Sequence, residues 1–143
     1  MTVATILNEK GTKVATVRPH QTIAILVQKL KLENIGAVVV SQDDKRVDGI
    51  ISERDIVRGL AAHGRELLTM TIDKLMVREV LTCAPEDSVK DVMQTMTTRR
   101  VRHLPVVERG KMVGVVSIGD VVKNRLEDVE MEARVLRDYI TAR

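Results

Sequence analysis

The sequence contains a tandem repeat, and this self-similarity limits the possible folds more than any other feature. Three segments recur at an offset of 65 or 66 positions: residues 14–19 and 80–85, 35–40 and 101–106, and 49–55 and 114–120. We therefore divide the chain into a first repeat at 1–66, a second repeat at 67–124 and a C-terminal extension at 125–143. The length of 143 residues allows one core, or two half-domains that share one.

Each repeat is predicted to run strand, helix, strand, strand, helix, which places the chain in the α/β (α+β) class. Strands are expected at 14–17 and 80–83, and Thr22 and Ser88 are expected to be the N-caps of the helices that follow. Runs of β-branched residues joined by short polar turns then predict a β-hairpin in each repeat. These strands are apolar on both faces, which favours helices on one side and the other repeat, sheet to sheet, on the other side.

The composition excludes several classes of protein. Hydrophobic residues make up 44% and charged residues 30%, as in soluble globular domains, and no apolar run reaches the roughly 20 residues that cross a bilayer. The N-terminus lacks the pattern of a signal peptide, so we expect a cytoplasmic protein. Cys83 is the single cysteine, and no Cys/His cluster indicates a metal. Tyr139 is the single aromatic residue, which disfavours nucleic-acid binding by base stacking.

The repeat carries three marks that resemble the cystathionine-β-synthase (CBS) domain family: a strand ending at Pro19 or Pro85, the run from Arg102 to Val106, and a closing Gly-h-h-Ser-x-x-Asp signature, where h is apolar. The resemblance covers about residues 1–124. It implies a pseudo-symmetric pair with two clefts between the repeats, assembled as a homodimer, that binds AMP, ATP or NAD(H) as an energy or redox sensor. No catalytic domain is left over, and the nucleotide-loop and zinc-protease motifs are absent, so we expect no enzyme.

The Ser-x-x-Asp motif has two compatible interpretations. Ser52 with Asp55, and Ser117 with Asp120, have the spacing of a helix capping box, in which the acid accepts from a free backbone N–H. A strand that leads into a helix N-terminus also presents N–H groups to an anion. In the family that the chain resembles, the Ser contacts phosphate and the Asp holds the ribose hydroxyls, and both repeats keep both residues.

The densest basic cluster lies at residues 99–103. The resemblance assigns phosphate binding to Arg102 and His103, whose counterparts in the first repeat are Gly36 and Ala37. Small residues supply no phosphate charge, so we expect two unequal clefts, with Asp120 in the cleft that holds Arg102 and His103. Arg54 is the candidate that replaces this charge in the first repeat.

The resemblance also places the first strands of the repeats, at Thr16 and Thr82, against the adenine edge. The full predicted nucleotide site is Thr16, Gly36, Ala37, Ser52, Arg54, Asp55, Thr82, Arg102, His103, Pro105, Ser117 and Asp120. Two other functions remain open at this point. One is a ligand-free dimerisation or docking module that regulates a partner protein, and the other is a sensor of S-adenosylmethionine.

The extension is predicted to be a long helix. Val122, Leu126, Val129, Ala133, Leu136 and Ile140 alternate in steps of four and three, which is the spacing of a heptad seam. This seam favours packing on the chain's own repeats, on a second copy or on a partner protein.

Overall fold

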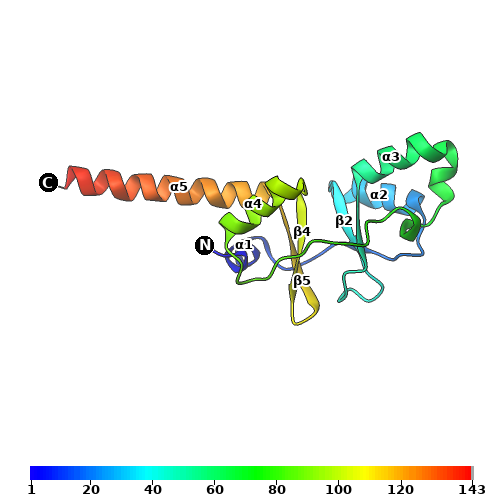
Figure 1. Ribbon diagram of the computed structural model, residues 1–143, viewed down its shortest axis with the longest axis horizontal. Coiled ribbons are helices and arrows are strands. Elements are labelled where there is room, and N and C mark those ends of the chain that lie inside the picture. Colours follow the sequence, from blue (N-terminus) through cyan, green and yellow to red (C-terminus); the bar gives the residue numbers. More distant parts are fainter. Residues whose placement is uncertain (143) are drawn as a thin grey trace.

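Two small sheets stand side by side at the centre of the molecule, one from each repeat (Figure 1). The computed structural model describes residues 1–142. The first sheet has the order β1-β2-β3, with β1 (Thr16–Val17) parallel to β2 (Ala37–Val40) and β2 antiparallel to β3 (Gly49–Ser52). The second sheet pairs β4 (His103–Glu108) with β5 (Lys111–Ser117) in antiparallel fashion. Both predicted hairpins are confirmed.

The first strand of each repeat is shorter than predicted. In the first repeat only Thr16 and Val17 pair, and in the second the segment 80–83 forms a single parallel bridge between Cys83 and Val106. The chain turns away directly after this bridge, because the Asp87 side chain accepts from the Ala84 N–H at 2.8 Å. The prediction of a full strand at 80–83 is therefore wrong, although the segment keeps the position of a first strand.

Helices cover the outer faces of both sheets. They are α1 (Val3–Lys10), α2 (Ile23–Glu33), α3 (Glu53–His63), α4 (Val89–Arg99) and α5 (Ile118–Thr141), with 3-10 turns η1 (Gly64–Thr69) and η2 (Ile72–Lys74) between the repeats. The predicted caps of α2 and α4 are confirmed, because the Thr22 hydroxyl accepts from the Ile25 N–H at 3.4 Å and the Ser88 hydroxyl accepts from the Asp91 N–H at 3.0 Å. These bonds satisfy backbone donors that the first helical turn leaves free.

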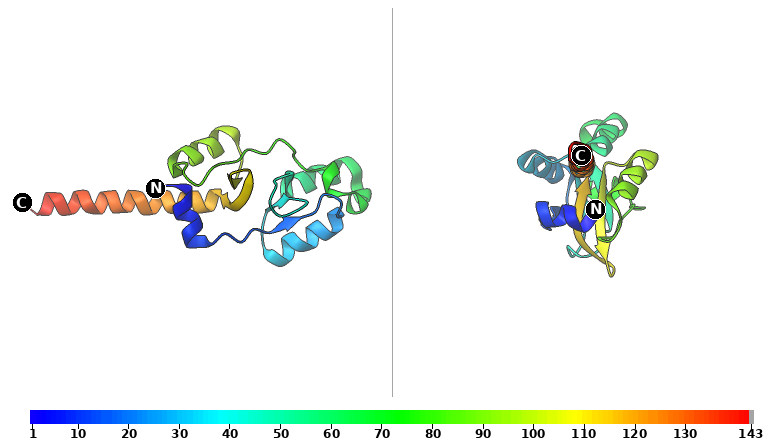
Figure 2. Two further views of the ribbon diagram at one scale, coloured as in Figure 1. Left: turned by 90° about the horizontal axis from the view of Figure 1, so that it is seen from below. Right: turned by 90° about the vertical axis from the view of Figure 1, so that its left-hand side faces the viewer.

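The segment at the start of each repeat, ahead of its first strand, packs into the core of the other repeat. Val3, Ile6 and Leu7 of α1 are buried in the core of the second repeat, and Figure 2 shows α1 in blue beside that repeat. In return Ile72 and Met76 are buried in the core of the first repeat. Full burial of each such aliphatic side chain stabilises the fold by about 1.5–3 kcal/mol. The exchange ties the two repeats into one unit.

The closing helix of the second repeat continues without a break into the C-terminal extension. This helix, α5, has 24 residues and projects away from the two sheets, so that its C-terminal end lies far from the rest of the molecule (Figures 1 and 2). From Val129 to Ala142 every residue is exposed, so this part of the helix does not pack on its own repeats. Within residues 1–142 no helix combines the length and the apolar character that a membrane span requires.

Candidate functional site

A cleft with a volume of about 810 Å³ lies between the two repeats, within the roughly 300–1,000 Å³ range of small-molecule sites. On one side it is lined by the N-terminal turn of α3, and on the other by the end of α4 and the start of β4. We call it the first cleft. The first repeat positions its wall because β2 begins at Ala37, which pairs with Ser52 at the end of β3, and the Glu53 N–H donates to the Gly36 carbonyl at 2.9 Å.

A capping box presents one carboxylate to the first cleft. The Asp55 Oδ2 atom accepts from the Ser52 backbone N–H at 2.9 Å and from the Ser52 hydroxyl at 3.1 Å. Within residues 1–142 no hydrogen bond to the Oδ1 atom of Asp55 is formed. One oxygen therefore holds the helix start, while the other is available to a ligand hydroxyl. Capping and ligand binding are compatible in this geometry.

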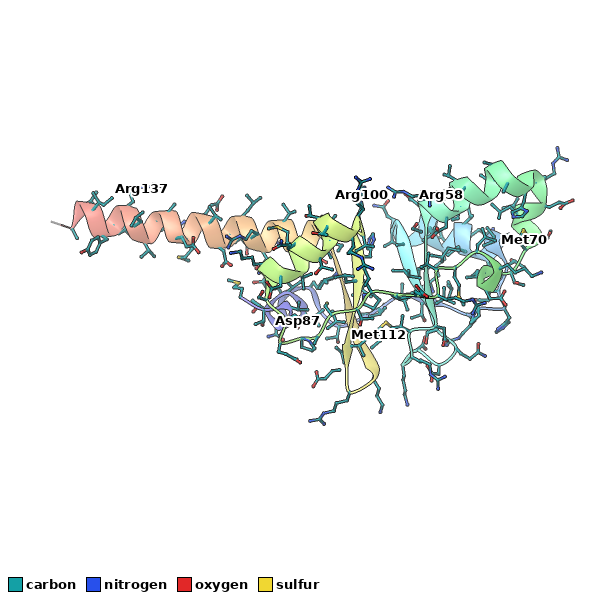
Figure 3. All side chains as sticks on the ribbon, in the orientation of Figure 1. Arg58, Met70, Asp87, Arg100, Met112 and Arg137 are labelled. Carbon is teal, nitrogen blue, oxygen red and sulfur yellow. The ribbon has the colours of Figure 1, made fainter. Side chains whose placement is uncertain are left out.

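Five guanidinium groups converge on the same cleft. Arg54 and Arg58 come from α3. Arg99 is the last residue of α4, and Arg100 and Arg102 lie between α4 and β4. Figure 3 shows Arg58 and Arg100 on opposite sides of the gap between the repeats. In the described part of the chain none of the five forms an ion pair with a carboxylate, and the three acids of the lining, Glu53, Asp55 and Glu79, leave the cleft with a net positive charge. Such a surface attracts an anion. A guanidinium group can donate two parallel hydrogen bonds to two oxygens of a phosphate.

The inner wall of the first cleft is apolar and small. Ile50, Val77, Val80 and Leu81 line it, together with Gly36 and Ala37. Val77 is fixed by a reciprocal pair of backbone hydrogen bonds with Ile50, at 3.0 and 2.9 Å. A flat ring fits between aliphatic side chains of this kind without aromatic stacking. The wall therefore suits the base of a nucleotide, while the rim suits its phosphates.

His103 lies at the border of this wall. Burial lowers the pKa of His103 below 6.5, Lys10 and Arg102 lower it further, and Asp120 opposes the shift. The imidazole is therefore neutral near pH 7 and takes up a proton when an anion approaches it.

The second capping box faces a different environment. The Asp120 Oδ2 atom accepts from the Ser117 N–H at 2.9 Å and from the Lys10 ammonium at 2.6 Å, and Lys10 also donates to the Val115 carbonyl at 2.9 Å. Burial alone would raise the pKa of Asp120, but the bonds from Lys10 and Ser117 lower it overall. The cavity at this box, lined also by Lys123, has only about 90 Å³, well below the size of a nucleotide site.

The predicted nucleotide-binding residues are distributed between two cavities of the structure and other positions. Seven of them line the first cleft, namely Gly36, Ala37, Ser52, Arg54, Asp55, Arg102 and His103. Arg102 and His103 share the lining of this cleft with Asp55, whereas Asp120 lines the small cavity closed by Lys10 but remains near enough to His103 to raise its pKa.

The other predicted residues lie outside the lining of the first cleft. The Thr16 hydroxyl donates to Asp44, which also forms an ion pair with Arg18 at 2.9 Å. The hydrogen bonds from Arg18 and Thr16 lower the pKa of Asp44. Pro105 is buried in β4, and Thr82 is exposed next to the bridge at Cys83.

The predicted site omits five charged residues that line the cleft, namely Glu53, Arg58, Glu79, Arg99 and Arg100. Arg99 and Arg100 were recognised as a basic cluster but were equally compatible with a solvated helix end. Arg58 follows Arg54 by four positions, and this helical spacing places both side chains on one face of α3. Glu79 belongs to the segment at the start of the second repeat, where no sequence signal indicates a site.

Comparison with known proteins identifies the repeats. The family model described as "CBS domain" matches residues 6–62 and 72–127. A CBS domain-containing mitochondrial protein of Arabidopsis thaliana is 36% identical over 123 residues, and the chain spans about 60% of its length. The CBS domain-containing protein YhcV of Bacillus subtilis is 31% identical over 126 residues, which cover 88% of this chain and 89% of that protein.

Two solved structures are similar to this fold. The CBS-domain-containing protein from Agrobacterium tumefaciens has a TM-score of 0.84 at 39% identity, covering 87% of this chain and 99% of that chain. A CBS domain pair solved in complex with 5'-methylthioadenosine and S-adenosyl-L-methionine has a TM-score of 0.78 at 24% identity, covering 90% of this chain and 98% of that chain. The second likeness shows the fold alone.

Proposed function

This chain belongs to the CBS domain family, and we propose that it is a regulatory module that binds an adenine nucleotide in the first cleft. The single observation that carries the proposal is the convergence of Asp55 with five arginines around an apolar wall. In this arrangement the Oδ1 atom of Asp55 accepts from the ribose hydroxyls, the base lies against Val80 and Leu81, and the phosphates lie among the guanidinium groups. Each contact uses the chemistry of the side chain that supplies it.

The charge of the first cleft favours a phosphorylated adenosine. A nucleotide brings two or more negative oxygens to the arginines, whereas S-adenosylmethionine brings a sulfonium cation and an ammonium group, which the same arginines repel. The adenosine-type ligands of one structural neighbour support the view that this fold has room for an adenosine group. We therefore propose AMP first, with ATP and NAD(H) as the alternatives that share the same adenosine monophosphate part.

A comparison of ligands tests this proposal directly. The purified chain is analysed by native mass spectrometry for nucleotide that survives purification, and its melting temperature is measured with AMP, ATP, NAD(H) and S-adenosylmethionine. A ligand at 100 times its Kd stabilises the fold by about 2.7 kcal/mol, which for a chain of this size is a rise of roughly 5–10 °C. If none of these ligands at millimolar concentration shifts the melting temperature, the chain is a docking module without a nucleotide.

A further inference from the structure

The outer part of α5 carries an apolar stripe that nothing in the described chain covers. Val122, Leu126, Val129, Leu136 and Ile140 are between 43% and 63% exposed. Together with Ala133 they follow each other in steps of four and three, so they lie along one side of the helix. The helix projects from the second repeat into solvent, as Figure 1 shows, and therefore has no surface of its own repeats to cover this stripe.

The stripe lies mostly beyond the segment that matches the family. The family model ends at Glu127, whereas α5 continues to Thr141. At a rise of about 1.5 Å per residue, this adds roughly 20 Å of helix. Contiguous apolar surface of this kind on a soluble protein marks an interface.

The charges beside the stripe show which partner fits. In heptad notation Leu126, Ala133 and Ile140 take position a, and Val122, Val129 and Leu136 take position d. Lys123 at position e and Tyr139 at position g lie at the two ends of the seam. Between them the flanking g positions are Arg125 and Glu132, and the flanking e positions are Glu130 and Arg137. In the described part of the chain none of these four side chains forms an ion pair within its own helix.

A second copy of α5 in parallel register complements these charges. In a parallel pair the g residue of one heptad faces the e residue of the next heptad on the other helix. Arg125 then faces Glu130 of the second copy, and Glu132 faces Arg137 of the second copy. Twofold symmetry repeats both contacts, so four attractive pairs border the seam.

The antiparallel arrangement of the same helices brings like charges together. With Leu126 opposite Leu136, the e positions face each other and the g positions face each other. Glu130 then meets Glu130 of the second copy, and Glu132 meets Glu132 of the second copy, both of which are repulsive. Charges at these positions select orientation in coiled coils, so the parallel form is favoured.

We propose that α5 pairs with α5 of a second copy as a parallel, in-register, two-stranded coiled coil along the seam from Val122 to Ile140. This assembly does not depend on nucleotide binding. Parallel pairing places both sets of repeats at the same end of the coiled coil, where the bodies of the two chains lie close enough to communicate. The small side chain of Ala133 at the centre of the seam allows the two helices to approach closely.

Disulfide cross-linking tests the geometry. In the parallel form Ala133 lies next to Ala133 of the second copy, so we expect Ala133→Cys to give a covalent dimer under mild oxidation. Met131→Cys is the matched control, because position 131 points away from the seam and is also exposed. The native Cys83 does not interfere, since it is buried and burial raises its pKa to about 12. A dimer from position 131 as fast as from position 133, or no dimer from position 133, overturns the proposal.

Charge reversal tests the orientation independently. Glu132→Arg and Arg137→Glu each replace two attractive contacts by two repulsive ones, so each variant alone should dimerise about tenfold more weakly at low salt. An equimolar mixture of the two variants restores both contacts and should form the heterodimer with affinity near that of the wild type. Sedimentation equilibrium gives the constants. Unchanged dimerisation of both variants, or no preference for the heterodimer, contradicts the parallel coiled coil.

Discussion

The two capping boxes begin equivalent helices, but they face different surroundings. Asp55 opens onto a cleft of about 810 Å³ lined by five arginines, whereas Asp120 is held by Lys10 in a cavity of about 90 Å³. The helix-start chemistry of the two repeats is the same. The difference comes from the segments at the start of the repeats, which pack across onto the other repeat.

These first segments carry opposite charges at two matched positions, Glu9 against Arg78 and Lys10 against Glu79. When Ile6 and Leu7 are matched with Leu75 and Met76, Lys10 corresponds to Glu79. The ammonium of Lys10 is attracted to Asp120 and covers it, while the carboxylate of Glu79 is repelled by Asp55 and leaves it open. A duplicated site thus became unequal through a residue outside the motif. We expect one nucleotide per chain, bound in the first cleft.

The largest effect on binding should come from the arginines that face each other across the first cleft. The double variant Arg58→Ala/Arg100→Ala removes two charged contacts to phosphate, which together are worth about 3 kcal/mol, or roughly a hundredfold in Kd. Calorimetry with AMP measures this loss.

Arg65→Ala is the matched control, because Arg65 is exposed in η1 of the same repeat but does not line the cleft. It should bind like the wild type. Equal losses in the double variant and in the control would mean that general attraction by the basic protein, and not the first cleft, holds the nucleotide.

The next effect compares the two boxes directly. Asp55→Asn should weaken AMP binding by about 10- to 30-fold, because an amide is a poorer acceptor for the ribose hydroxyls than a carboxylate. Asp120→Asn should leave the Kd within about twofold. Both substitutions alter a helix cap by about 1 kcal/mol, so chemical denaturation of both variants controls for stability. A larger loss of affinity at Asp120 would place the nucleotide in the second box.

Part of this arrangement was predictable from the sequence. The repeat, the hairpins and the caps at Thr22 and Ser88 depend on local patterns, so the sequence alone located them. The presence of Arg102 and His103 in the lining agrees with the role that the family resemblance assigned to them. Local chemistry specifies these features because neighbours in the chain decide them.

The sequence did not predict which basic residues lie beside each capping box. Lys10 and Asp120 are 110 positions apart, and their contact exists only because α1 packs on the second repeat. No pattern in the sequence indicates that the first segment of each repeat packs onto the other repeat. The opposition of Asp55 to Arg102 likewise depends on how one repeat is rotated against the other, which is a tertiary property.

Freeing the Asp120 carboxylate from Lys10 should have a smaller effect on nucleotide binding. Lys10→Ala removes the ion pair and frees Asp120, so we expect a second and weaker binding event in calorimetry, while the affinity of the first cleft is unchanged. Lys13→Ala is the control, since Lys13 is exposed in the same segment. The ion pair is partly exposed, so its loss should lower the free energy of unfolding by at most about 1 kcal/mol. A single binding event in Lys10→Ala would show that the pair has only a structural role.

The smallest expected effect is a pH dependence that arises from His103. In the free protein burial and the nearby cations lower the pKa of His103 below 6.5. Phosphate in the first cleft stabilises the imidazolium and raises this pKa, so binding takes up a proton and tightens as the pH falls from 8 to 6. The ligand phosphate itself titrates in this range, so the Kd of the wild type is compared with the Kd of His103→Gln at each pH. At pH 6 we expect the wild type to bind about two- to fivefold more tightly than the variant.

The free energy of unfolding should depend on pH with the opposite sign to the affinity. This difference distinguishes a role of His103 in binding from a role in stability. Above pH 6.5 His103 is neutral in both the folded and the unfolded chain, so it contributes no pH dependence there. As the pH falls through 6.5 the unfolded chain takes up the proton first, and the free energy of unfolding of the free protein decreases. The wild type should therefore lose stability relative to His103→Gln in acid, while it gains affinity relative to that variant. Urea denaturation at pH 6 and pH 8 gives the difference in stability, and calorimetry at the same pH values gives the difference in affinity. If the affinity of the wild type and that of His103→Gln depend on pH in the same way, His103 lies too far from the phosphate to respond.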